Sequence, residues 1–394
     1  MHIESCPICG TPAAAPFVHR LDVPCHQHIV CASPEDARRA NRGTLDMAAC
    51  ASCGFVFNRS FDPARLSYGQ SYDNAQSHSA HFDAYLDGLA DMLVREKQVR
   101  DCTIVEVGCG KGEFLRKLVN DPATGNRGIG FDPSYVGPET ELGGRLTFRK
   151  SYYDASCAAV PADVVICRHV IEHIQTPLDM LRSVRAALSQ APNARVFFET
   201  PAVEWILRGQ VIWDFFYEHC SLFSQESIRT AFQRAGFKVE DVHYIFGEQY
   251  LWVEATLADP DAAGAIPAAD PSALLSLTQS YAEAEARLIG HLKTRLDEER
   301  SHAKIAVWGA GAKGVTLANL LDPEGTRIDC LIDLNPNKQG HFVPGTGHPI
   351  VSPEQASRRG VTMAVLMNPN YRNENLKLLA EQNIRMELVD WSKQ

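Results

Sequence analysis

The sequence contains no segment of the kind that directs a chain into or across a membrane. The amino terminus, MHIESCPICG, lacks the basic stretch and apolar core of an export signal. No apolar run approaches the ~20 residues that span a bilayer. Positive charge is not in surplus either, because the formal net charge is −10. These absences argue against export, membrane insertion and binding to nucleic acid, so we expect a cytoplasmic protein with neither a membrane nor a nucleic-acid partner.

The composition is that of a globular chain with more than one domain. Hydrophobic residues make up 45% and charged residues 22% of the sequence, which allows a sizeable core in each domain. A length of 394 residues exceeds one ordinary core and favours two or three domains. Twelve cysteines without an export signal indicate metal ligands and buried thiols rather than disulfides.

Two C-x-x-C-G motifs predict a metal-binding module over residues 1–80. Cys6 and Cys9 form the first pair, and Cys50 and Cys53 form the second. Each motif places two thiolates on a tight turn, and two turns complete a closed tetrahedral site for structural Zn²⁺, although iron would fit the same ligands. Between the motifs lies Cys25-His-Gln-His28, which we interpret as a polar loop rather than a second metal site because its spacing is irregular.

Residues 103–132, TIVEVGCGKGEFLRKLVNDPATGNRGIGFD, predict a nucleoside-cofactor half-site. An apolar strand leads into a glycine turn, a helix follows, and a second strand ends at an aspartate. The turn reads G-x-G-x-G after a glutamate, whereas dinucleotide sites use G-x-G-x-x-G to seat a pyrophosphate. The stretch resembles the first motif of class I methyltransferases that use S-adenosylmethionine (SAM). We therefore assign to SAM binding Glu106, Gly108, Gly110, Gly112, Asp132, Tyr153, Asp154, Arg168 and His169.

Strands and helices alternate through residues 81–258, as a doubly wound α/β sheet requires. We expect helices at 82–98 and 177–190, strands at 103–107, 127–131, 163–167 and 195–199, and a closing hairpin of 237–245 with 250–257. His169 and His173 in the HVIEH segment would share one helical face, and only His169 should reach the cleft. A metalloprotease interpretation of this segment lacks a third ligand.

The remainder of the chain predicts a linker and a third unit. Residues 258–271 are rich in Ala, Pro and Asp, and a helix from 271 to 301 completes a connecting segment over 259–302. Residues 303–394 begin with a strand and the G-x-G-x-x-G sequence that starts at Gly309, followed by a strand over 328–333. This is a Rossmann-like unit. Taken alone, its glycine motif would also fit a reductase with Asp333 on the ribose.

The whole chain resembles the three-domain, zinc-containing, SAM-dependent sugar C-methyltransferases that act on nucleotide-linked 4-keto-deoxysugars in antibiotic and surface-polysaccharide pathways. The resemblance rests on the order of CPICG, CASCGFVFN, VEVGCGKGEF, HVIEHI, FFETP, YEHCSLFS and GAGAKGVTLANLL, with IDLNPNKQGHFVPGTGHPI near the end. It implies that the last unit binds no nicotinamide and serves as scaffold or substrate cradle. It also implies a small-molecule partner, a nucleotide-sugar, for a monomer or small homo-oligomer.

Methylation of a carbon beside a ketone requires a base, and His219 is our candidate. Its imidazole has an ordinary pKa near 6.5, and Glu218 beside it could raise its basicity or bind the sugar. The Glu-His pair of the resembled family falls on these positions. That family commonly has tyrosine two residues before the glutamate, where this chain has Phe216. Tyr72 is our candidate to supply the missing hydroxyl. Because position 216 carries no hydroxyl, O- or N-methylation stays open as the alternative.

Several further residues are candidates for substrate contacts, namely Tyr217, Lys313, Asn368, Asn370 and Tyr371. Lys313 lies in a glycine loop before a helix, where a cation can contact a diphosphate or remain solvated. The two asparagines and Tyr371 follow the strand expected at 362–367 and either touch substrate or cap the next helix. The zinc motifs alone would fit a non-enzymatic scaffold, which would need neither the glycine turn nor the Glu-His pair.

Overall fold

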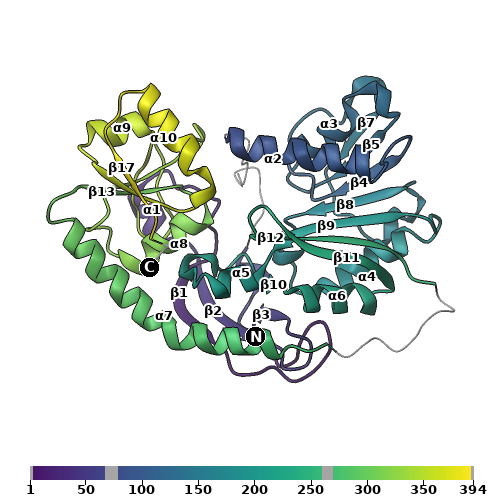
Figure 1. The fold of residues 1–394 in the computed structure, drawn as a ribbon, viewed down its shortest axis with the longest axis horizontal. Helices are drawn as coiled ribbons and strands as arrows, with labels where there is room; N and C mark the ends of the chain where they lie inside the picture. Colours follow the sequence, from purple (N-terminus) through teal and green to yellow (C-terminus); the bar gives the residue numbers. More distant parts are fainter. Residues whose placement is uncertain (1–2, 67–78, 260–268, 392–394) are drawn as a thin grey trace.

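The structure is a computed structural model that describes residues 3–66, 79–259 and 269–391. Its ribbon has a right-hand lobe built from the middle of the chain and a left-hand lobe built from the carboxyl-terminal part, with the amino-terminal strands low between them (Figure 1). Tyr72 lies outside the described residues. None of the described helices combines the length and the apolar character needed to cross a membrane.

The amino-terminal unit is a small antiparallel sheet that borrows its last strand from the middle of the chain. The strand order is β1-β2-β3-β10. The strands are β1 (Val18–Pro24), β2 (Arg42–Ala49), β3 (Val56–Asn58) and β10 (Ser221–Leu222), and a short helix α1 (Pro34–Arg38) joins β1 to β2. Because β10 follows directly after His219, this sheet fixes one end of the segment that carries the expected base.

The middle unit is an eight-stranded sheet in the order β11-β12-β9-β8-β4-β5-β7-β6. Its parallel part is β4 (Thr103–Val107), β5 (Arg127–Phe131), β7 (Leu146–Arg149), β8 (Val164–Arg168) and β9 (Arg195–Pro201). The edges are antiparallel: β6 (Thr140–Glu141) on one side, and β12 (Tyr250–Leu257) with β11 (Phe237–Ile245) on the other. The chain order reverses direction at β4, which puts a ligand-binding switch point between β4 and β8.

Helices cover both faces of this sheet, as apolar stripes in the sequence require. They are α2 (Ala80–Asp91), α3 (Glu113–Val119), α4 (Pro177–Ala187), α5 (Val203–Arg208) and α6 (Gln225–Arg234). The helix expected at 82–98 becomes π-helical at Met92–Glu96, and the one expected at 177–190 ends three residues early. The expected strand at 127–131 and hairpin strands at 237–245 and 250–257 have the predicted bounds.

The carboxyl-terminal unit is a second parallel sheet, in the order β15-β14-β13-β16-β17. The strands are β13 (Ile305–Trp308), β14 (Cys330–Ile332), β15 (Ile350–Val351), β16 (Met363–Leu366) and β17 (Glu387–Val389). The helices are α8 (Ala312–Leu321), α9 (Pro353–Arg358) and α10 (Arg372–Glu381). This is a Rossmann-type order, and its switch point lies between β13 and β16.

One long helix, α7 (Ser272–Glu299), connects the lobes along the lower edge of the molecule (Figure 1). Its buried side chains recur every three or four residues, as one helical face requires: Leu274, Thr278, Tyr281, Ala284, Leu288, Leu292 and Leu296. They join a hydrophobic cluster that also contains Leu45 of β2, Ile206 of α5 and Val315 of α8. Through α7, one core therefore connects all three units.

Candidate active site

The glycine turn after β4 can form only with glycine at its tightest points. Gly108 and Gly112 have φ angles of +69° and +79°, in the left-handed region that favours glycine. A Cβ atom on Gly108 would lie 2.1 Å from the Val170 side chain, and one on Gly112 would lie 2.3 Å from Phe148. The N–H of Gly110 donates to Oδ2 of Asp132 at 2.9 Å, which joins the turn to the end of β5.

Asp132 and Glu106 flank this turn in different hydrogen-bonding environments. Asp132 accepts hydrogen bonds at Oδ1 from the N–H and hydroxyl of Ser134. Glu106 is 3% exposed, and among the described residues its Oε2 has no hydrogen-bond partner. Burial raises the pKa of Glu106 to about 8. A buried acceptor without a donor, beside a glycine turn, fits a ligand that brings its own donor, such as the ammonium group of SAM.

The other residues expected to bind SAM occupy the ends of neighbouring strands. Tyr153 is buried, its ring lies edge-on to Phe131 at 5.0 Å, and its hydroxyl has no hydrogen-bond partner in the described parts of the chain. Asp154 is exposed and caps a short 3-10 helix by accepting from the N–H of Ser156 at 2.9 Å. Arg168 ends β8, packs over the ring of Phe114 and pairs with Glu199 at 2.5 Å.

His169 is held between two buried carboxylates. Its Nε2 lies 3.1 Å from Glu199 and its Nδ1 3.4 Å from Glu172, and neither glutamate is exposed. Both ring nitrogens face acceptors, so the imidazole is doubly protonated. Burial alone would lower the pKa of His169, but Glu199 and Glu172 outweigh it and raise the pKa to about 9. Burial would likewise raise the pKa of Glu199, but Arg168 and His169 lower it to about 2.

His219 has the opposite protonation state to His169. Its ring lies 4.1 Å from that of Phe216 and 4.8 Å from that of His173. Burial first, and then the positive charges that His173 and His28 would carry, hold the pKa of His219 well below its ordinary value. The imidazole is therefore neutral near pH 7 and has a lone pair to accept a proton. The two imidazoles therefore differ in protonation state because their surroundings differ.

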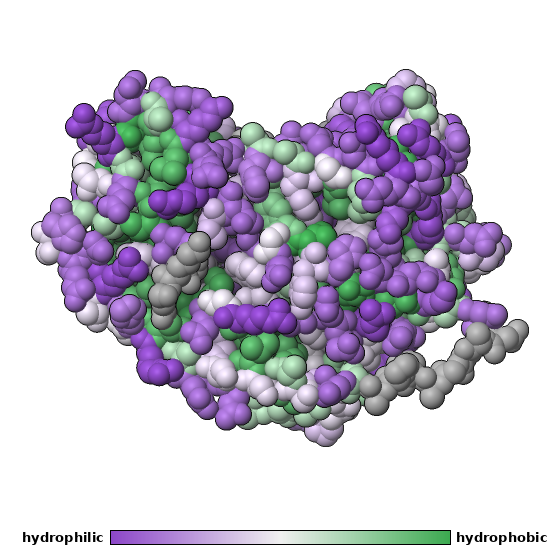
Figure 2. Space-filling model, viewed as in Figure 1, coloured by the Kyte–Doolittle hydropathy of each residue, from purple (hydrophilic) through white to green (hydrophobic). Residues whose placement is uncertain are grey.

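Both imidazoles line one cleft of about 310 Å³ between the lobes. The outline of the molecule is hollowed between the two lobes in the space-filling view (Figure 2). The walls come from all three units, and include the segment after β8 in the middle sheet and the switch point of the carboxyl-terminal sheet. Glu106, the glycine turn after β4 and Asp132 are not among the residues that line this cleft. Residues that line it include His28, His169, His173, Trp205, Asp214, Phe216, His219, Tyr250, Gly309, Lys313, Asp333, Lys338, Asn368 and Tyr371.

The structure places some of the expected catalytic and substrate residues outside this lining. Glu218 is fully buried behind His219, where Oε1 accepts from Nδ1 of His26 at 3.1 Å. Tyr217 is also fully buried, and its hydroxyl accepts from the N–H of Asp62 at 2.9 Å. Asn370 lies beside the cleft, and its N–H donates to Oδ1 of Asn368, which caps the turn that follows β16.

Sequence reasoning was wrong about His173, which lines the cleft beside His219. The segment is not the expected α-helix. His169 has a φ of +53°, and a single 3-10 turn follows at Ile171–His173, so the i and i+4 residues do not share a helical face. Sequence reasoning also missed Trp205, Asp214 and Tyr250, for which no motif gave a signal.

The carboxyl-terminal unit presents a second half-site to the same cleft. Gly309 has a φ of +115°, and the N–H of Ala310 donates to Oδ2 of Asp333 at 2.9 Å, just as Gly110 donates to Asp132. Two cations lie nearby. Lys313 pairs with Asp214 at 2.7 Å, and the buried Lys338 donates to the carbonyl of Ala310 at 3.3 Å.

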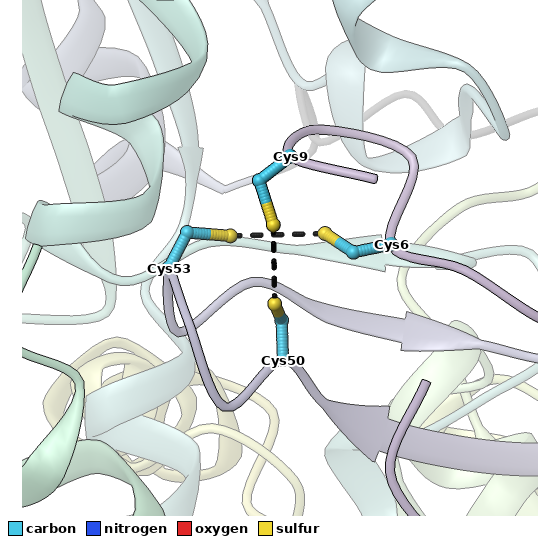
Figure 3. A group of neighbouring side chains, drawn as sticks. All are labelled: Cys6, Cys9, Cys50 and Cys53. Atoms are coloured by element: carbon cyan, nitrogen blue, oxygen red, sulfur yellow. Dashed lines mark hydrogen bonds between the residues drawn. The ribbon is translucent and has the colours of Figure 1, made fainter. Parts of the chain in front are cut away.

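The four cysteines of the amino-terminal motifs converge on one point (Figure 3). Their sulfur atoms all lie within 4.8 Å of one another, with Cys6 to Cys53 at 3.7 Å and Cys9 to Cys50 at 3.4 Å. A tetrahedral Zn²⁺ with Zn–S bonds of about 2.3 Å requires sulfurs ~3.8 Å apart. The arrangement fits such an ion closely, with all four positions taken by protein.

A second group of possible ligand atoms lies in the cleft, where Glu172, His173 and His219 approach within 4.8 Å of one another. Glu172, however, already faces His169 and accepts a hydrogen bond from Thr200 at 3.2 Å. Glu172 of this group is therefore already in contact with two protein donors.

Comparisons with known proteins agree with this geometry. A methyltransferase domain model matches residues 78–242, and a C-methyltransferase C-terminal domain model matches residues 269–386. C-methyltransferase NovU of Streptomyces niveus is 25% identical over 94% of this chain and 91% of its own length. A ubiquinone biosynthesis O-methyltransferase of Vibrio parahaemolyticus is 32% identical over 25% of this chain and 43% of its own length.

Among solved structures, the chain is similar to 1,6-didemethyltoxoflavin-N1-methyltransferase of Burkholderia thailandensis, with a TM-score of 0.35 and 16% identity over 52% of this chain and 96% of that one. The matched methyltransferase domain and the strand order of the middle sheet identify the fold of the middle unit. The fold is the class I SAM methyltransferase fold, as the glycine turn predicted.

Proposed function

The protein is a SAM-dependent methyltransferase, and we propose that it methylates a carbon atom beside the ketone of a nucleotide-linked keto-deoxysugar. The observation that carries this proposal is the half-buried, neutral imidazole of His219 in a cleft that also contains His169, just after β8 of the methyltransferase sheet, and the glycine half-site of the carboxyl-terminal unit. The matched C-methyltransferase C-terminal model supports carbon as the acceptor atom.

The chain's own groups account for the proton transfer. His219 accepts the proton from the carbon beside the ketone, and the electrons of the broken C–H bond move toward the ketone oxygen to give an enolate. SAM, when bound, supplies an electrophilic methyl group on a positively charged sulfur. The glycine turn, Glu106 and Asp132 would hold it, because they offer close backbone approach and acceptors for its ammonium and ribose hydroxyls. His219 afterwards releases its proton to solvent.

The nucleotide part of the proposed substrate fits the carboxyl-terminal half-site. Lys313 and Lys338 would neutralise a diphosphate, and Asp333 would accept from ribose hydroxyls. Asn368 and Tyr371 lie at the next strand end along the same wall. This arrangement supports substrate binding by a glycine motif that otherwise suggests a nicotinamide cofactor.

We further propose that the four cysteines hold one structural Zn²⁺. The site has no open coordination position, so the ion contributes to folding and not to the methyl transfer.

The second candidate function is O- or N-methylation of another small biosynthetic intermediate. Phe216 favours it, because the ring beside His219 carries no hydroxyl to hold an enolate. Such a reaction needs a base or proximity alone.

One experiment separates the two. The enzyme is incubated without SAM in deuterated water with nucleotide-linked 4-keto-deoxysugars, and exchange of the proton beside the ketone is followed by NMR. If the enzyme methylates carbon, the wild type should exchange this proton. His219→Gln should abolish the exchange, and calorimetry should show that the variant still binds SAM. His243→Gln is the matched control. The His243 side chain is half-exposed on the outer strand β11, so this variant should retain exchange. No exchange by the wild type, together with methylation of an oxygen or nitrogen acceptor, would overturn the first proposal.

A further inference from the structure

The proposed enolate needs a hydrogen-bond donor that the residue beside His219 does not provide. When His219 removes the proton, negative charge develops on the ketone oxygen, and donors aimed at that oxygen stabilise the transition state. Phe216 has no polar atom to offer there. This inference rests on the proposed function, since a reaction without an enolate would not require the donor.

Three side chains with hydroxyl groups line the cleft within the described parts of the chain: Ser79, Tyr250 and Tyr371. Ser79 is committed elsewhere, because its hydroxyl donates to Glu374 at 2.6 Å and accepts from the N–H of Phe82 to cap α2. Tyr371 belongs to the carboxyl-terminal unit, where it ends the turn after β16 next to the proposed nucleotide site, and its ring packs against His81 and Phe246.

Two further tyrosines near the catalytic segment are also committed. Tyr85 donates its hydroxyl to the buried Glu199 at 2.8 Å, and Tyr217 is hydrogen-bonded to Asp62 outside the cleft. Tyr250 therefore remains as the hydroxyl donor of the methyltransferase wall.

The ring of Tyr250 is held firmly by its surroundings. The residue begins β12 and pairs with Pro201 of β9 on one side and with Ile245 of β11 on the other. Its ring stacks on Phe246 with centroids 5.1 Å apart and planes 4° apart. It also lies edge-on to the ring of His169, at 4.6 Å. Across the residues that the structure describes, no hydrogen bond of the Tyr250 hydroxyl is found, so the ring is fixed and its O–H is available to a ligand.

The charges around Tyr250 favour a neutral donor. Burial, and then Tyr371 and Glu199, raise the pKa of its hydroxyl well above the ordinary value, so it stays protonated over the working range. The adjacent His169 carries a positive charge held by Glu199 and Glu172. An O–H group beside an imidazolium is well placed to face an oxygen that becomes negative.

We infer that Tyr250 is a catalytic residue whose hydroxyl donates a hydrogen bond to the ketone oxygen of the substrate while His219 removes the neighbouring proton. The C–H bond breaks, its proton goes to His219, and its electron pair moves into the enolate. The Tyr250 proton stays on its own oxygen throughout. Methyl transfer from the sulfonium to the enolate carbon would leave the electron pair of the broken methyl–sulfur bond on sulfur, remove the negative charge from the ketone oxygen and weaken the hydrogen bond again.

Tyr250→Phe tests this role, because it removes one oxygen atom and keeps the ring. We expect kcat, and the rate of solvent exchange without SAM, to fall by roughly 10²- to 10³-fold, as for loss of one oxyanion donor. KM and the Kd for SAM should change less than about threefold. Tyr244→Phe is the matched control, since Tyr244 lies opposite Leu251 on the neighbouring strand and outside the cleft lining, and it should keep wild-type exchange.

The experiment distinguishes failure of the role inferred for Tyr250 from failure of the proposed function. If the wild type exchanges the proton and Tyr250→Phe exchanges it equally fast, Tyr250 is not the donor. If the wild type itself neither exchanges nor methylates carbon, the proposed function fails instead.

Should Tyr250→Phe lose SAM binding or unfold, 3,5-difluorotyrosine at position 250 provides the second test, because it keeps the ring and makes the hydroxyl more acidic. An alkaline limb of the exchange rate that moves to lower pH supports the role, and an unchanged pH profile overturns it.

Discussion

Oε1 of Glu218 lies 3.1 Å from Nδ1 of His26, although 192 positions separate the two residues in the chain. The same oxygen accepts from the N–H of Gln27 at 3.3 Å. Glu218 therefore faces the loop of the amino-terminal unit that carries His26 and His28, while the adjacent His219 faces the cleft. One residue of the Glu-His pair anchors the loop, and the other is available for chemistry.

Glu218→Gln should weaken this anchor. Burial would raise the pKa of Glu218, but the hydrogen bond from His26 lowers it, so the carboxylate is charged and its loss costs about 1.5–3 kcal/mol. Urea unfolding measures the change. A double-mutant cycle with His26→Gln should give a coupling energy of at least ~1 kcal/mol. Additive effects of the two substitutions would mean that the contact contributes nothing.

The charged state of His169 predicts a loss of stability at alkaline pH. Its pKa rises from 6.5 to about 9 on folding, so the stabilisation is fully present below about pH 6.5 and disappears as the pH passes through 9. We expect ~2–3 kcal/mol of unfolding free energy to be lost over that range. His169→Gln should lack this component, and equal alkaline loss in both proteins would show that other groups cause it.

Cys9→Ser should abolish binding of the proposed structural metal. Removal of one of four thiolates breaks the closed site, and small zinc modules derive most of their folding energy from the ion. Metal analysis of the purified protein should give one equivalent for the wild type and for the control Cys102→Ser, which lies outside the cluster, and none for Cys9→Ser. A full equivalent in Cys9→Ser would place the metal elsewhere.

Gly108→Ala and Gly143→Ala separate two effects of a side chain. Both glycines have left-handed backbones, with φ of +69° and +65°, and that conformation costs alanine about 1 kcal/mol at either position. Only at Gly108 would the new Cβ meet a neighbour, Val170 at 2.1 Å. Calorimetry should show SAM affinity lowered roughly tenfold or more in Gly108→Ala and unchanged in Gly143→Ala. Equal affinities would mean that the turn can adjust.

Sequence reasoning succeeded where the signal was local. The strand at 127–131 and the hairpin 237–245 with 250–257 were predicted to the residue, because alternating apolar residues bounded by turns specify strands. The cysteine spacing predicted four sulfurs that meet. Neighbouring residues carry the whole strand pattern, and the cysteine pattern repeats one local motif at two places in the chain.

It failed where distant segments decide the outcome. Glu218 turns toward His26 because the amino-terminal loop packs behind it, which no local pattern reveals. The HVIEH segment has helical spacing, but the contacts of His169 with Glu199 and Glu172 hold its backbone in the left-handed region and end any helix there. Tyr250 begins a strand that was correctly predicted, yet its place in the cleft depends on β9 and on the lobe opposite.

The strand-order reversal of the carboxyl-terminal sheet opens onto the cleft at Gly309 and Asp333, and His169 reaches the same cleft from the end of β8 in the other lobe. Under the proposed function, separate stretches of polypeptide would therefore bind the methyl donor and the acceptor. Recombination between related enzymes within α7 would then exchange the proposed acceptor-binding lobe and retain the methyltransferase lobe.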